Sequence, residues 1–161
     1  ELGRPPRQDE VEPLSHFIME RVDRLSALDY LQVKRLAHRV NLAMSAEFAD
    51  VDLLLTPSTA TLPPPVGWVS GSAPDFNYER WGARSYAFAP FSEVFNVTGQ
   101  PAASVPVSLA ANGMPIGMQL IGKQGEDHVV LRMAAHLESV TGWISRHPSY
   151  WAGSLDQDQG P

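Results

Sequence analysis

The sequence predicts an α/β fold, with helices packed on a mixed sheet. Residues 103–109 and 115–122 are two apolar runs of strand length, and the connection between them contains Asn112-Gly113. Asn-Gly between two such runs is the strongest short-range signal for a β-hairpin, because both residues tolerate a positive φ. A third apolar run, residues 52–56, lies between two helical regions. That pattern is typical of a strand buried on both faces of an α/β sheet.

The N-terminal third predicts two amphipathic helices. Asp9 and Glu12 have the spacing of a capping box, and apolar residues follow at helical spacing. Ser26 and Asp29 repeat the capping pattern before a second, longer helix. This second helix is expected to run to about Phe48, with an apolar stripe of Val33, Leu36, Ala37, Val40, Ala43, Met44 and Phe48.

Residues 58–75 lack any periodicity and predict a loop that is long for a compact domain, so we expect it to be functional or packed on a partner. The aromatic stretch after it, residues 76–88, allows two interpretations. In the first, its large side chains are core: Trp81, Tyr86 and Phe88. In the second, four residues spaced roughly i, i+3, i+4 and i+7 form a wall of a ligand cleft: Tyr86, Ala89, Pro90 and Glu93.

The C-terminal half predicts two further helices around the hairpin. Pro90 suits the first turn of a helix over residues 90–97, because its missing amide hydrogen would have no partner there. Inside the second hairpin strand, Gly117 and Gly122 indicate a bulge or a close approach of another backbone. A terminal helix is expected over residues 125–142, ending at Gly142. Its inward face would consist of Val129, Val130, Met133, Ala134, Leu137 and Val140.

Composition excludes several classes of function. A formal charge of −6 with scattered arginines argues against a nucleic-acid-binding protein. The absence of cysteine rules out disulfides and thiolate metal sites. No apolar run reaches the roughly 18 residues of a membrane-spanning helix. No stretch of the sequence has the pattern of a signal peptide, so we expect none. At 161 residues the chain suits one domain or part of a larger one.

The chain offers no self-contained hydrolase site. The segment 67–71 lacks the G-x-S-x-G spacing and has no strand before it. Ser104 begins a strand, where a hydroxyl usually satisfies a neighbouring backbone group. Lys34 lies on an amphipathic helix, and Lys123 follows the end of a strand. Neither position is typical of a buried, desolvated lysine that acts as a base. The five histidines show no i, i+4 metal-binding spacing.

Three linked stretches nevertheless resemble the amidase signature family, serine hydrolases that cleave carboxylic amides. The hairpin stretch FNVTGQPAASVPVSLAANGMPIGMQLIG (residues 95–122) is similar to the C-terminal hallmark of that family. ADVDLLLTPSTATLPPPVG (residues 49–67) and GEDHVVLRMAAHLE (residues 125–138) follow the family's order and spacing. The opening ELGRPPRQDEVEP (residues 1–13) resembles in particular the branch of aminohexanoate cyclic-dimer (nylon-oligomer) hydrolases.

The resemblance implies a role for each of five residues. In related enzymes the residues just before the Phe-Asn-x-Thr-Gly segment line the acyl side of the substrate channel. By position, Tyr86, Ala89 and Glu93 would face the substrate, with Phe95 and Asn96 nearby. Asn96 has a second role open to it, as a residue at a helix C-terminus that bonds the backbone.

The resemblance further implies that this chain is the C-terminal part of a three-layer α/β/α amidase. Residues 1–153 would belong to that domain, and residues 154–161 to a polar tail. The Ser–cis-Ser–Lys triad would lie in the N-terminal part of the same protein, so this chain alone would be inactive. We expect a small amide as substrate, no metal or other cofactor, no nucleic-acid or membrane partner and a cytoplasmic location, with a homo-oligomer left open. A non-catalytic assembly or small-molecule-binding subunit is the alternative.

Overall fold

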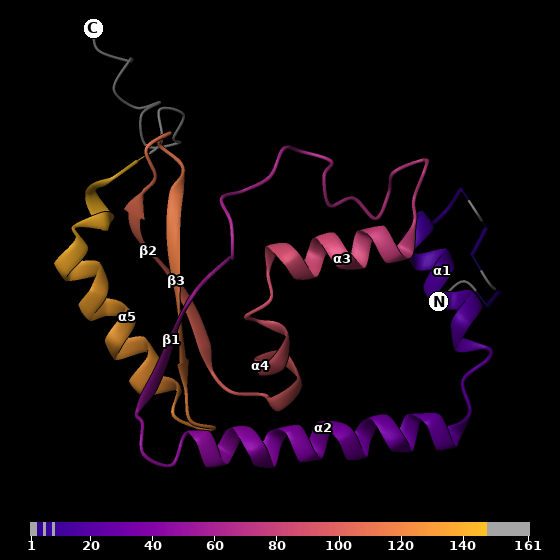
Figure 1. Cartoon of the computed structure of the whole chain (residues 1–161), viewed down its shortest axis with the longest axis horizontal. Coiled ribbons are helices and arrows are strands. Elements are labelled where there is room, and N and C mark those ends of the chain that lie inside the picture. Colours follow the sequence, from indigo (N-terminus) through magenta and orange to yellow (C-terminus); the bar gives the residue numbers. More distant parts are fainter. Residues whose placement is uncertain (1–2, 5, 8, 148–161) are drawn as a thin grey trace, which may run out of the picture.

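The computed structural model describes residues 3–4, 6–7 and 9–147. A long helix, α2, connects a small sheet at one end of the molecule to the N-terminal helix α1 at the other (Figure 1). The elements are, in chain order, α1 (Pro13–Val22), α2 (Ala27–Glu47), β1 (Leu53–Pro57), α3 (Tyr78–Phe88), α4 (Glu93–Thr98), β2 (Ala102–Leu109), β3 (Pro115–Gly122), α5 (Asp127–Thr141) and the 3-10 helix η1 (Trp143–Ser145). The predicted α/β class is confirmed, whereas the predicted tail, residues 154–161, lies outside the described residues.

The sheet has the order β1-β3-β2, and both pairings are antiparallel. Thr56 of β1 lies opposite Gln119 of β3, which lies opposite Ser104 of β2. The pairing shifts by one residue between Pro106 and Ser108, where β2 carries a bulge opposite Gly117. Of the two alternatives predicted from that glycine, a bulge is present, but on the neighbouring strand rather than on its own.

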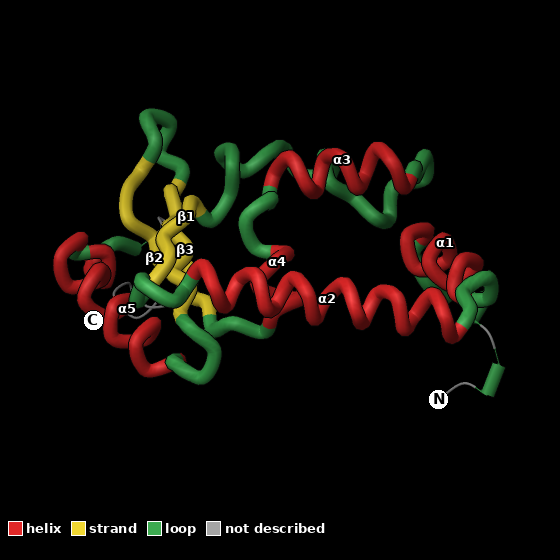
Figure 2. Tube along the Cα trace, turned by 60° about the horizontal axis from the view of Figure 1, so that its bottom comes forward, coloured by secondary structure: helices red, strands yellow, loops and turns green. Residues whose placement is uncertain are grey.

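Helices lie on both sides of this sheet (Figure 2). On one face α5 packs on Leu120 and Val105, chiefly through Val130. On the other face Ile121 packs against Phe95 of α4 and Phe48 at the end of α2. Adjacent residues of a strand point to opposite faces, so Leu120 and Ile121 contribute to two separate apolar clusters.

In this chain alone, the strand predicted from residues 52–56 is not buried on both faces. The strand forms, as β1, but it lies at an edge of the described sheet and pairs only with β3 there. Leu55 is 51% exposed, and Leu54 is exposed as well. A short apolar run does not reveal how many neighbours a strand has, and in the described part of the chain β1 has one.

The two N-terminal helices begin differently from one another. At α2 the predicted capping box is present: Ser26 Oγ accepts from the Asp29 amide, and the Asp29 carboxylate accepts from the Ser26 amide. The same prediction for Asp9 and Glu12 is wrong. Helix α1 begins at Pro13 after Glu12, and the side chain of Glu12 makes no capping bond.

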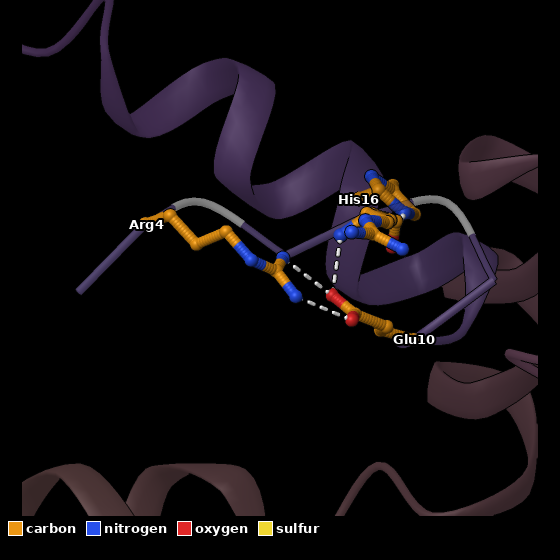
Figure 3. A network of polar contacts seen from close by, with 4 residues as sticks. Arg4, Glu10 and His16 are labelled. Carbon is orange, nitrogen blue, oxygen red and sulfur yellow. Dashed lines mark hydrogen bonds and ion pairs between the residues drawn. The ribbon is translucent and has the colours of Figure 1, made fainter. Parts of the chain in front are cut away.

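The carboxylate that organises the N-terminal segment is that of Glu10 (Figure 3). It accepts from both terminal nitrogens of Arg4, at 2.8 and 2.6 Å, and from the Arg7 amide at 2.8 Å. The Arg4 guanidinium, followed by the Arg7 amide, holds the pKa of Glu10 below its ordinary value. His16 lies against the Arg7 carbonyl oxygen, 3.2 Å from it.

The aromatic stretch forms a helix, α3, for which no helical pattern was evident in the sequence. Its N-terminal end packs on α1, where Phe17 stacks on Tyr78 with ring centroids 4.2 Å apart. The next helix, α4, begins at Glu93, so the predicted start at Pro90 is three residues early. Pro90 lies instead in the turn between α3 and α4.

The hairpin and the terminal helix follow the prediction closely. Gly113 adopts φ +82° in the connection between β2 and β3, and the Met114 amide donates to Asn112 Oδ1 at 3.2 Å. Helix α5 ends at Gly142, with φ +62°. Its inward face is shorter than predicted, because Val140 is 70% exposed.

Candidate functional site

The connection between α3 and α4 is held at two points, one by the long loop and one by the sheet. The Ala60 amide donates to the carbonyl oxygen of Phe88 at 2.8 Å. Gln119 Nε2 of β3 lies 3.4 Å from the carbonyl oxygen of Phe91 and donates to it. Ala89 therefore lies on a short connection held by β3 and by the start of the long loop.

Next to this connection, the sheet presents a polar row on the face away from α5. Directly opposed residues of antiparallel strands share a face, so Thr56, Gln119 and Ser104 lie together across all three strands. Gln119 is buried and donates to Thr56 Oγ1 at 3.2 Å. At the end of β1, Ser58 Oγ lies 2.5 Å from Ser104 Oγ. The row is uncharged and contains both hydrogen-bond donors and acceptors, which suits a neutral polar ligand.

The absence of a side chain at Gly117 leaves the space that Ser58 and Ser104 of this row occupy. A Cβ at this position would lie 2.7 Å from Ser58 Oγ and 3.3 Å from Ser104 Oγ. The Ser58 amide also donates to the Gly117 carbonyl oxygen at 3.0 Å, which continues the β1–β3 ladder by one residue. The nearest neighbours of Gly117 are therefore two serine side chains, whereas the prediction was the backbone of another segment.

A separate apolar groove of about 390 Å³ lies between α2 and the α3–α4 region. Its wall on α2 is the N-terminal part of the predicted stripe, which the described residues leave open to solvent. Tyr86 and Glu93 line the opposite wall. The complete lining consists of Val33, Leu36, Ala37, Val40, Tyr86, Pro90, Glu93, Val94 and Val97.

The five predicted substrate-wall residues do not share one cavity. Tyr86 and Glu93 line the apolar groove, and Tyr86 is 59% exposed, so its interpretation as core is wrong. Ala89 is half-buried, and its amide donates to the Ser85 carbonyl oxygen. Phe95 is buried against Phe48, whereas Asn96 is exposed on α4. Substrate contact by these residues remains a prediction.

Sequence reasoning missed Ser58 and Gln119 as members of the polar row. Gln119 carried a signal, since it is the one amide side chain within the apolar run 115–122. Ser58 carried none, because its partner Ser104 is 46 residues away along the chain. Ser104 was assigned a backbone contact, but its hydroxyl bonds a side chain instead.

The described residues provide no evident metal site or membrane span. No group of three His, Asp or Glu side chains in residues 3–4, 6–7 and 9–147 could hold a metal ion. None of the helices that the structure describes is long and apolar enough to cross a membrane.

Comparison with known proteins gives a consistent picture. The family model described as Amidase matches residues 4–131. The 6-aminohexanoate-cyclic-dimer hydrolase of Paenarthrobacter ureafaciens is 30% identical over 151 residues, which cover 91% of this chain and 31% of that protein. A solved structure of 6-aminohexanoate cyclic dimer hydrolase superposes with a TM-score of 0.82 at 30% identity, over 91% of this chain and 31% of that one.

A more distant structure shares the fold alone. A bacterial aryl acylamidase of the amidase signature family superposes with a TM-score of 0.66 at 23% identity, over 85% of this chain and 28% of that one. This chain thus spans about a third of the length of the relatives that it matches.

Proposed function

This chain belongs to the amidase family, and from that premise we propose that it forms the C-terminal part of an enzyme that hydrolyses the C–N bond of carboxylic amides. The likeness to 6-aminohexanoate-cyclic-dimer hydrolase carries the proposal, because it extends over 91% of this chain in both sequence and structure. Since the chain corresponds to 31% of that relative, the activity belongs to the whole protein.

The catalytic groups are proposed to lie in the N-terminal part of the same protein. Among the described residues, no serine hydroxyl forms a hydrogen bond with a lysine. The hydroxyls of Ser58 and Ser104 bond each other, and neither forms a hydrogen bond with a basic side chain that the structure describes. A serine needs an adjacent base or a lowered pKa to act as a nucleophile. A Ser–cis-Ser–Lys triad, as the family resemblance implies, would supply that base.

The proposed reaction has two steps. The serine oxygen attacks the amide carbon, the C–N bond breaks and the amine leaves with a proton delivered by the triad. Water then attacks the acyl-serine ester, which releases the carboxylic acid and restores the serine hydroxyl. Neither step needs a metal ion or a nucleotide.

This chain is proposed to supply the sheet edge and the wall of the substrate channel. Ala89 is the residue best placed for that role, because the connection that carries it is held on both sides, through Phe88 by the long loop and through Phe91 by β3. A rigid wall holds a substrate in a reactive position, and small displacements are costly. Tyr86 and Glu93 would border the same channel from the groove side, with Phe95 and Asn96 behind them.

The substrate is proposed to be a small linear or cyclic amide. The relative with the extensive match is named for a cyclic dimer of 6-aminohexanoate, which contains amide bonds and no ionised group. An uncharged polar row and an apolar groove are compatible with that class of molecule. Besides the substrate, this chain is proposed to bind the N-terminal part of the same protein. A homo-oligomer is proposed as well, because β1 is an exposed edge of the described sheet.

The test compares the complete protein with this chain alone. Both are assayed against acetamide, an anilide and the 6-aminohexanoate cyclic dimer, and the acyl-enzyme is trapped and located by peptide mass spectrometry. We expect hydrolysis by the complete protein only, with the acyl group on a serine outside these 161 residues. Hydrolysis by the isolated chain that disappears on Ser104→Ala would overturn the assignment, and amide binding without hydrolysis by the complete protein would favour the non-catalytic alternative.

A further inference from the structure

A small polar hollow of about 130 Å³ lies between the long loop and α3, and none of the residues of the polar row lines it. Two arginines of α3, Arg80 and Arg84, are one helical turn apart and both line it. Trp68 and Asp75 of the loop and Asn77, the N-cap of α3, line it as well. Two guanidinium groups in one hollow repel each other and favour negative charge nearby.

One of these cations is already paired. Arg80 Nη2 donates to the Asp75 carboxylate at 2.8 Å and to the Asp75 carbonyl oxygen at 2.6 Å. Both bonds use the same nitrogen, so Nε and Nη1 of Arg80 form no hydrogen bond with the residues that the structure describes. The side-chain oxygen Oδ1 of Asn77 accepts from the Arg80 amide at 2.8 Å, which leaves the Asn77 side-chain NH₂ group as a donor.

The second guanidinium, that of Arg84, is not paired with a carboxylate of the described residues. Arg84 Nη1 donates to the carbonyl oxygen of Trp68 at 2.9 Å, and the guanidinium lies 5.2 Å from the centroid of the Trp68 ring. Within residues 3–4, 6–7 and 9–147, Arg84 forms no ion pair. Stacking on the indole holds the guanidinium in place and leaves its Nε and Nη2 edge available.

The hollow therefore contains two positive charges and one negative charge, with its uncommitted polar groups mainly donors. We propose that it binds a small monocarboxylate, held between Arg84 and Arg80. A planar carboxylate matches the fork of a guanidinium and would bring the charge of the hollow to zero. The small volume limits the ligand to a few non-hydrogen atoms within the hollow. Carboxylate binding here does not require the proposed hydrolysis, so each can fail without the other.

The competing explanation is that Arg84 only fastens the loop to α3 through Trp68. Asp75 separates the two explanations, because it competes with a bound carboxylate for Arg80. Asp75→Asn removes that competitor, so a ligand site should bind more tightly. A purely structural fastening would show a lowered stability and no gain of binding.

The experiment is a titration of the complete protein with acetate, at constant ionic strength, followed through the indole N–H resonances of Trp68 and Trp81. Acetamide, a neutral molecule of the same shape, and chloride are the control ligands. We expect saturable shifts with acetate only, a loss of affinity of roughly tenfold or more in Arg84→Gln, and tighter binding in Asp75→Asn. Arg35→Gln, on exposed α2, is the matched control and should change nothing.

Three outcomes would overturn the carboxylate site. They are equal shifts with acetate and chloride, an affinity for acetate that survives Arg84→Gln, and weaker or unchanged binding in Asp75→Asn. If Arg84→Gln does not fold, Arg84→Lys is the second variant, because it keeps the positive charge but lacks the planar guanidinium that can bind both carboxylate oxygens. The proposal predicts weaker acetate binding in this variant.

Discussion

Ser58 Oγ and Ser104 Oγ lie 2.5 Å apart across the position where Gly117 has no side chain. The three residues come from the end of β1, from β2 and from β3, so this one contact joins all the strands of the described sheet. It also closes one end of the polar row next to the connection that carries Ala89.

Gly117→Ala should destabilise the protein, although alanine and valine suit a strand better than glycine does. A Cβ at this position would lie 2.7 Å from Ser58 Oγ and 3.1 Å from Ser58 Cβ, so the serine must move and lose its partner. We expect a cost of about 1–3 kcal/mol, the usual range for overpacking, and a larger one for Gly117→Val. Urea unfolding of the complete protein measures it.

The Ser58→Gly background is the control for this prediction. Without the serine side chain, the nearest remaining atom to the new Cβ is Ser104 Oγ at 3.3 Å, a contact that needs little adjustment. The cost of Gly117→Ala should then shrink, which a double-mutant cycle detects. An equal cost in both backgrounds would mean that Ser58 is not the obstacle.

The isolated chain should self-associate through β1. This strand is an edge of the described sheet, and Leu55 on it is 51% exposed. Unpaired edges promote association, and a charged side chain on the edge blocks it. Leu55→Lys should therefore shift the chain towards monomer in sedimentation, whereas Leu131→Lys on exposed α5 should not. A monomer at every concentration before any substitution would contradict the prediction.

Ser26→Ala should weaken α2 and with it one wall of the apolar groove. The hydroxyl oxygen of Ser26 accepts from the Asp29 amide at 3.1 Å, and removal of such a cap costs about 0.5–2 kcal/mol. Thermal unfolding of the complete protein checks the loss. Ser45→Ala, near the other end of the same helix, makes only a 3.4 Å contact with Asn41 and should cost less.

The same cap predicts a dependence on pH. Hydrogen bonds from the Ser26 hydroxyl and then the Ser26 amide lower the pKa of Asp29. A lowered folded-state pKa gives stability that is complete above the ordinary value of about 4 and is lost as the pH falls through the lower value. Asp29→Asn should flatten the stability profile in that acid range, as followed by helical circular dichroism. An unchanged profile would remove Asp29 as a contributor.

Much of the fold could be predicted because its signals are local. Ser26 and Asp29 are three residues apart, Gly113 lies within its own turn, and Gly142 ends the helix that precedes it. In each case the residues that decide the structure are neighbours in sequence. The likeness in residues 95–122 to a known family then placed these local elements in an α/β fold.

The features that were missed depend on distant residues. The pairing of β1 with β3 joins residues more than 60 positions apart, and nothing within residues 52–56 indicates an edge strand. The capping box predicted from Asp9 and Glu12 does not form, and the Glu12 carboxylate accepts instead from Ser72 Oγ at 2.6 Å, 60 residues away along the chain. Helix α3 was missed because its aromatic side chains, such as Tyr78 against Phe17, follow contacts with another element.

The last prediction concerns Ala89, in the complete enzyme. Ala89→Trp should reduce kcat/KM far more for a long acyl amide than for a short one, because an indole would fill space meant for the acyl group. Even one methylene in such a pocket is worth about 1–3 kcal/mol. The connection that carries Ala89 is held by the Ala60–Phe88 and Gln119–Phe91 bonds, so it cannot easily move aside. The measurement is kcat/KM for both amides together with a melting curve. Ala87→Trp, two residues earlier and exposed on α3, is the matched control and should affect both substrates little.

If Ala89 is only a packing residue, tryptophan should overpack it and lower the melting temperature, with equal losses on both amides. That result would remove Ala89 from the channel wall, and with it the reason for placing Tyr86 and Glu93 there.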